Sequence, residues 1–130
     1  MLELTMAAVS PEDEETTGGM FMADAPSEPG AVLRVGRDDA VCRLATPEDW
    51  LFVSRVQLEF QCGPDGNWQV TWLRGSQPKP VSDVRLTVGQ ADQPIGYGAT
   101  VSLPRGADGK IAIHDRNTPR SVDVGFFHEV

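Results

Sequence analysis

Two short arginine-containing segments hold the residues best suited to chemistry in this 130-residue chain. Gly36-Arg37 follows one segment of alternating apolar and polar residues, and Ser54-Arg55 begins another. An arginine guanidinium presents a planar fork of hydrogen-bond donors, and a serine hydroxyl adds one more. A phosphate group matches such donors, because it offers three strong acceptor oxygens and about −1.5 to −2 charge near pH 7. If the fold brings the two segments together, they predict a phosphate-binding site.

The segments that must position these residues have the pattern of short β-strands. Residues 56–62 and 68–72 alternate apolar with polar side chains, and Gly63-Pro64-Asp65-Gly66-Asn67 supplies a reversal between them. Further strands are expected at residues 31–35, 41–45, 84–88, 100–103, 111–113 and 122–126. Residues 46–49 are expected to form a single turn on a loop. Since no long segment has helical periodicity, the sequence predicts an all-β sandwich, with Trp68 and Trp72 in its core.

The N-terminal third differs from the rest in charge and composition. Residues 1–30 contain seven acidic residues and no Lys or Arg, so the net charge of −8 belongs almost wholly to them. Residues 1–9 alternate and predict a first strand, whereas residues 10–30 are acidic, contain Gly and Pro, and predict a flexible loop. The alternative is a wholly disordered tail. The sandwich itself is expected to span residues 31–130.

Composition also limits the classes of partner and compartment. An acidic chain disfavours nucleic acid and anionic membranes as partners, because both require a basic surface. The start of the sequence lacks the pattern of a signal peptide, so we expect a reducing cytoplasm, in which Cys42 and Cys62 are free and buried. No spacing of Cys and His indicates a metal site, and no cofactor is expected.

The order of these segments resembles that of the forkhead-associated (FHA) domain. That family is an eleven-strand β-sandwich whose loops at one end bind phosphothreonine peptides. Its motifs match Gly36-Arg37, the strand start Ser54-Arg55-Val56-Gln57, the hairpin return Trp68–Trp72, and Arg74-Gly75-Ser76 in a third loop. The sequence is therefore identified as a divergent member, of bacterial type, with about eleven short strands and an acidic N-terminal loop or tail.

The resemblance implies roles for particular residues. It places the phosphate on Arg37, Ser54 and Arg55, and the ligand's main chain on the third loop, where Ser76, Gln77 and Lys79 are the candidate contacts.

The sequence departs from the family pattern at three positions: Gln57 replaces a histidine, the family asparagine falls near Gln77 or Pro78, and Ala99 replaces a late acid. The Gln57 amide both donates and accepts, so it is able to brace the loop. If Pro78 takes the place of the asparagine, binding of the ligand's main chain is expected to weaken more than binding of the phosphate, because proline has neither a side-chain donor nor an N–H.

The leading functional hypothesis is a non-catalytic phosphothreonine-peptide binding module in Ser/Thr kinase signalling. Its expected partners are a phosphorylated protein or peptide and a Ser/Thr kinase. Thr16 and Thr17 resemble the phosphorylatable tail of small bacterial FHA regulators and are candidate phosphorylation sites. The alternative is a degenerate FHA-like domain that assembles with proteins independently of phosphate. An enzyme is not expected, because the one tempting pair, His114-Asp115, lies on a strand whose neighbouring side chains point to opposite faces.

Overall fold

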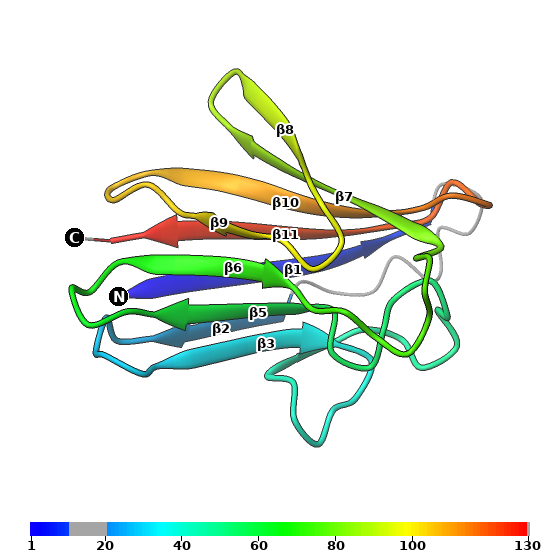
Figure 1. Cartoon of the computed structure of the whole chain (residues 1–130), viewed down its shortest axis with the longest axis horizontal. Helices are drawn as coiled ribbons and strands as arrows, with labels where there is room; N and C mark the ends of the chain where they lie inside the picture. The colour runs from blue at the N-terminus through cyan, green and yellow to red at the C-terminus, as the bar shows by residue number, and fades with distance from the viewer. Residues whose placement is uncertain (11–20, 130) are drawn as a thin grey trace.

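The computed structural model describes residues 1–10 and 21–129 of the chain. These residues form eleven strands in two sheets that face each other as two layers (Figure 1). The six-stranded sheet has the order β2-β1-β11-β10-β7-β8. Its strands are β1 (Leu2–Val9), β2 (Phe21–Ala25), β7 (Ser82–Val88), β8 (Ala91–Ile95), β10 (Asp108–Asp115) and β11 (Ser121–His128).

The second sheet carries the hairpin that the sequence predicts most clearly. Its order is β4-β3-β5-β6-β9. The strands are β3 (Val32–Gly36), β4 (Leu44–Ala45), β5 (Leu58–Cys62), β6 (Trp68–Trp72) and β9 (Thr100–Ser102). Strands β5 and β6 pair antiparallel, with Leu58 opposite Trp72 and Cys62 opposite Trp68. The described residues form no helix, and so none that is long and apolar enough to cross a membrane.

The core between the sheets consists of the inward residues of the alternating strands. Trp68 and Phe60 have no exposed surface, and Trp72 is 3% exposed. Both tryptophans are therefore core residues, as predicted. The two cysteines, Cys42 and Cys62, are buried and free, also as predicted. Each buried apolar side chain contributes roughly 1.5–3 kcal/mol to folding, so this layer dominates stability.

The N-terminal residues belong to the sandwich rather than preceding it. Strand β1 pairs with β11 along its whole length and with β2 on its other side. The sequence predicted a flexible segment over residues 10–30, but Phe21–Ala25 forms β2, whose Ala23 and Ala25 are buried. Small alanines alternating with Met22 and Asp24 make a short edge strand that acidic composition concealed. The rest of that segment, residues 11–20, lies outside the described residues.

Two other segments differ from the sequence-based expectation. The strand predicted over residues 41–45 shortens to Leu44–Ala45, because a turn in which the Val41 and Cys42 N–H groups donate to the Asp38 carbonyl occupies its start. The sequence also missed β8, in which four of the five residues, Pro94 among them, are exposed. Proline is compatible with such a position because β8 is an edge strand.

The loops that carry the candidate site gather at one end of the sandwich. Both termini lie at the other end (Figure 1). The β3–β4 loop of residues 37–43, the β4–β5 loop of residues 46–57 and the β6–β7 loop of residues 73–81 leave the sheets at the site end. Strands of the six-stranded sheet end or begin together here, since Val9 at the end of β1 lies opposite Ser121 at the start of β11, and Asp115 at the end of β10 lies opposite Ser82 at the start of β7. The sandwich thus serves as a frame that holds distant loops together.

Candidate functional site

The segments that contain Arg37 and Ser54 lie directly against each other. The Arg37 N–H donates to the Ser54 carbonyl over 3.1 Å, and the Asp38 N–H donates to the Arg55 carbonyl over 3.0 Å. Gly36 permits this approach, because a Cβ at that position would lie 2.2 Å from the Arg55 carbonyl oxygen. No side chain fits at such a distance. The glycine of the Gly-Arg pair therefore provides close backbone contact, and the arginine follows it into the loop.

The predicted phosphate-binding residues line a common pocket at this end of the sandwich. The pocket has a volume of about 220 Å³. Its polar lining residues are Arg37, Ser54, Arg55, Ser76, Gln77 and Ser82, and its other lining residues are Leu51, Phe52, Pro80, Val81 and Tyr97. Five of the six residues predicted from the sequence are thus brought together. Lys79 is exposed but does not line the pocket.

The two arginines of the pocket differ in how they are held. The half-buried Arg37 donates through Nε to the Val53 carbonyl and through Nη1 to the Glu48 carbonyl, and both acceptors lie on the β4–β5 loop. Arg55 is exposed. Among the described residues, neither arginine forms a salt bridge, although Arg34, Arg85 and Arg116 each pair with a carboxylate. Both guanidinium groups therefore keep charge and donors for a ligand.

An acidic hollow adjoins this pocket. Arg37 and Arg55 also line a second cavity, of about 400 Å³, together with Asp38, Asp39 and Glu48. The Asp38 carboxylate accepts a hydrogen bond from the Ala40 N–H, which fixes the turn of the β3–β4 loop. Carboxylates this close to the arginines reduce the positive potential that an arriving anion meets, by an amount that depends on salt.

Gln57 braces the part of the pocket that Ser54 and Ser82 line. Its side chain has no exposed surface. The Gln57 Oε1 accepts from the Ser54 N–H over 2.8 Å, and its Nε2 donates to the Ser82 Oγ over 3.3 Å. One amide therefore joins the β4–β5 loop to the start of β7. The bracing role predicted for this residue is consistent with these two bonds, which use both the donor and the acceptor of the amide.

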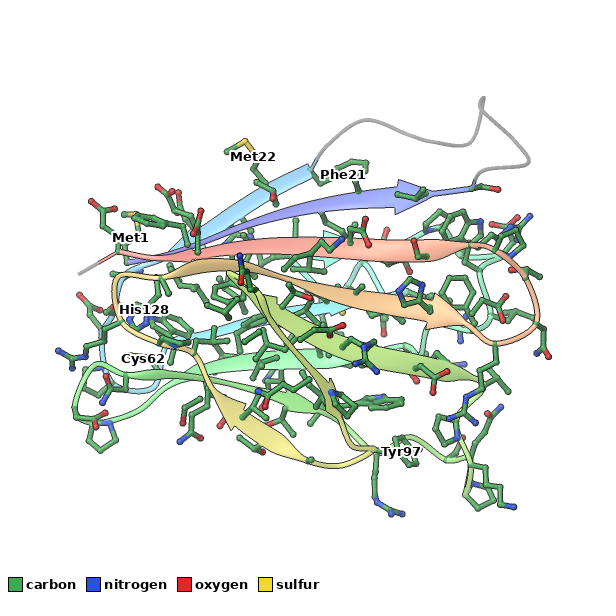
Figure 2. All side chains as sticks on the ribbon, turned by 90° about the horizontal axis from the view of Figure 1, so that it is seen from above. Met1, Phe21, Met22, Cys62, Tyr97 and His128 are labelled. Atoms are coloured by element: carbon green, nitrogen blue, oxygen red, sulfur yellow. The ribbon has the colours of Figure 1, made fainter. Side chains whose placement is uncertain are left out.

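Tyr97 is a lining residue that the sequence gave no reason to select. It lies in the β8–β9 loop, residues 96–99, at the side of the molecule away from Phe21 and Met22 (Figure 2). Its hydroxyl accepts a hydrogen bond from the Gly75 N–H and donates one to the Gln77 carbonyl. No short motif links positions twenty residues apart, so only the fold reveals the contact. The Tyr97 ring also packs on Trp72, which is core.

The other predicted residues lie away from the pocket or beyond the described chain. Thr16 and Thr17 are outside the described residues. His114 is exposed, and the Asp115 carboxylate accepts hydrogen bonds from the Asn117 N–H and the Thr118 hydroxyl. Within the described residues, no hydrogen bond joins His114 to Asp115. The same residues contain no cluster of three or more side chains that could hold a metal ion.

Cys42 lies beneath the site. Its thiol donates to the Arg55 carbonyl over 3.4 Å. Burial raises the pKa of the Cys42 thiol above its ordinary value, and the nearby Asp38 charge raises it further. Burial likewise raises the pKa of the Cys62 thiol, and the Asp65 charge adds to this. Both groups are therefore protonated at neutral pH and behave as small apolar side chains.

Solved structures of FHA domains superpose on this sandwich. An engineered FHA domain, solved with a Myc-pTBD peptide, aligns with a TM-score of 0.54 and 17% identity, covering 96% of this chain and 91% of that one. The N-terminal FHA domain of S. cerevisiae Rad53p, solved with a phosphothreonine peptide, aligns with a TM-score of 0.54 and 12% identity, covering 95% of this chain and 93% of that one. This chain has the FHA fold.

The comparison confirms the sandwich of about eleven strands expected from the sequence. No protein-family model and no curated protein matches the sequence. At such low identity the likeness concerns the path of the backbone rather than the side chains. Within the FHA fold, the loops that carry Arg37 and Ser54 lie at one end of the two sheets. The chemistry of the site therefore has to be argued from this chain's own residues.

Proposed function

We propose that this FHA-fold domain is a non-catalytic module that binds phosphothreonine peptides in Ser/Thr kinase signalling. The observation that supports it most strongly is the pocket on which Arg37, Ser54 and Arg55 converge. Among the described residues, no carboxylate forms a salt bridge with either arginine. Two FHA domains of similar backbone were solved with a Myc-pTBD peptide and with a phosphothreonine peptide, which supports this class of ligand.

The donor set suits a reversible contact. Hydrogen bonds to charged groups contribute roughly 1.5–3 kcal/mol each. Two guanidinium groups and one hydroxyl supply at least three such bonds to a phosphate, against an association cost of at least about 4 kcal/mol. The remainder corresponds to weak or moderate binding. Contacts of the peptide main chain with Ser76 and Gln77 would add to it.

The proposal extends to the partners of the domain. They are a phosphorylated protein or peptide and the Ser/Thr kinase that modifies it, and neither nucleic acid nor membrane is included because the chain is acidic. Thr16 and Thr17 are proposed as phosphorylation sites, whose product would bind to the same pocket in the same chain. Kinase-treated protein should then show shifted NMR signals for Arg37 and Arg55, and unshifted signals would remove this part of the proposal.

The test is binding to a phosphothreonine peptide library and to the same library without phosphate. The wild-type domain should bind only phosphorylated peptides, and Arg37→Ala should lower their affinity at least about tenfold, the equivalent of one lost charged hydrogen bond. Arg85→Ala is the matched control, because Arg85 is an exposed arginine paired with Asp92 away from the pocket.

The second candidate is phosphate-independent assembly, and the acidic hollow of Asp38, Asp39 and Glu48 favours it. Carboxylates beside the arginines weaken the attraction for an anion. Equal binding of phosphorylated and plain peptides, unchanged by Arg37→Ala, would establish this alternative and reject the first.

A further inference from the structure

Between its two ends, which backbone hydrogen bonds of Leu73 and Val81 hold, the third loop of the site is tied among the described residues by the Tyr97 hydroxyl. In the chain as described, residues 74–80 form no backbone–backbone hydrogen bond. The Tyr97 hydroxyl accepts from the Gly75 N–H over 2.7 Å and donates to the Gln77 carbonyl over 2.9 Å. This one hydroxyl therefore ties both flanks of Ser76, which lines the pocket, to the β8–β9 loop.

The Tyr97 ring is itself held in place. It meets the buried Trp72 edge to face, with ring centroids 5.2 Å apart and an interplanar angle of 64°. The Arg74 guanidinium lies over the Tyr97 ring, 5.0 Å from its centroid. Gly98 leaves the space for Arg74, because a Cβ there would lie 3.0 Å from the Arg74 Nε, and its φ of +81° favours glycine. The hydroxyl is thus fixed relative to the core.

We propose that Tyr97 is the positioning residue that orders the β6–β7 loop for the ligand's main chain. The inference rests on the proposed function. Pro78 contributes no N–H, and the two exposed loop residues that line the pocket, Ser76 and Gln77, offer a hydroxyl and an amide to a peptide. All of residues 74–79 are exposed, and an untethered loop would lose conformational entropy on binding. The Tyr97 hydroxyl removes that cost beforehand, which is preorganisation.

The role predicts a division between peptide affinity and phosphate affinity. Tyr97→Phe deletes the hydroxyl and keeps the ring on Trp72. Neither the hydrogen bond from Arg37 to the Val53 carbonyl nor the one from Ser54 to Gln57 involves Tyr97. The variant should therefore weaken binding of a phosphothreonine peptide while leaving binding of free phosphothreonine nearly unchanged.

The experiment measures both ligands on three proteins: the wild type, Tyr97→Phe and Arg37→Ala. The peptide is the tightest binder selected from the phosphothreonine library, and the second probe is free phosphothreonine followed by NMR titration. Tyr97→Phe should lower peptide affinity about tenfold, as expected for two neutral hydrogen bonds, and change phosphothreonine affinity by less than about twofold. Arg37→Ala should weaken both.

A second measurement reads the residue directly. Tyr97 is the one tyrosine of the chain, so fluorotyrosine incorporation gives a single fluorine NMR signal at this position. That signal should shift when the peptide is added to the wild-type protein.

Three results would overturn the inference: unchanged peptide affinity in Tyr97→Phe, an equal loss for both ligands, or a fluorine signal unmoved by the peptide. If instead neither phosphorylated ligand binds the wild-type domain, the proposed function fails, and this inference fails with it.

Discussion

Replacement of Gln57 by leucine tests whether a buried amide holds the site together. Gln57→Leu keeps a side chain of similar length and removes both hydrogen-bonding groups. The Ser82 hydroxyl, on a residue 2% exposed, and the Ser54 N–H then lose their partners. An unsatisfied buried polar group costs about 1–3 kcal/mol, and the added apolar burial of leucine returns part of that.

The net loss expected for Gln57→Leu is about 2 kcal/mol of unfolding free energy. For a domain of this size that corresponds to a decrease in melting temperature of roughly 6–10 °C. Peptide affinity should decrease at least about tenfold as well, because Ser54 is no longer fixed at the pocket. Calorimetry and titration with the library-selected peptide measure the two effects.

A variant with histidine at this position separates the hydrogen bonds from the shape of the side chain. In Gln57→His, one imidazole nitrogen is able to accept from the Ser54 N–H while the other donates to the Ser82 hydroxyl. This variant should stay within about 1 kcal/mol of the wild type and retain binding. Gln69→Leu, on an exposed position of β6, is the control. Gln57→Leu and Gln69→Leu of equal stability and equal affinity would refute the reasoning.

Three further changes have defined outcomes. Gly36→Ala should destabilise the domain by at least about 1–3 kcal/mol in chemical denaturation, because its Cβ meets the Arg55 carbonyl, while Gly96→Ala, with an ordinary 3.6 Å contact, should not. Glu48→Gln, in the acidic hollow, should strengthen phosphopeptide binding a few-fold at low salt, and the gain should vanish at high salt. Burial raises the pKa values of the Cys42 and Cys62 thiols, so the folded domain holds these protons more tightly than the unfolded chain does. The resulting contribution to the free energy of unfolding is fully present below the ordinary thiol pKa. It should decline as pH rises through the raised values, and a Cys-to-Ala double variant should show a flatter pH profile by denaturant titration.

The sequence predicted those parts of the fold whose signal is local. Residues 58–62 and 68–72 alternate cleanly around a turn-forming segment, so the β5–β6 hairpin could be placed within a residue or two. Strand β8 was missed because Pro94 and polar neighbours occur where an edge strand tolerates them. Strand β2 was missed because acids and prolines surround it, although pairing with β1 decides its conformation. Local composition does not record which strands lie at an edge.

The same distinction applies to the site. Arg37, Ser54 and Arg55 could be predicted to converge, because each lies at the end or start of a strong strand pattern and the family resemblance supplied their order. The placement of Gln57 in a fully buried environment could not be derived from alternation, which gives it the outward parity of Glu59. Tyr97 could not be found at all, because its partners Gly75 and Gln77 are close to it only after the two sheets pack.

Two uncharged residues, Gln57 and Tyr97, brace the loops around a pocket that adjoins the acidic hollow. Gln57 fixes the loop that presents Ser54, and Tyr97 fixes the loop that presents Ser76 and Gln77. Neither is charged, so neither competes with the arginines for an anion or adds to the repulsion from the acidic hollow. Because the two braces reach different elements, the start of β7 and the β8–β9 loop, the proposed contacts with a phosphate and with a peptide main chain depend on separate hydrogen bonds. Pro78 fits this arrangement, because residues 74–80 form no backbone–backbone hydrogen bond in the described part of the chain and the Tyr97 hydroxyl bonds Gly75 and Gln77 instead.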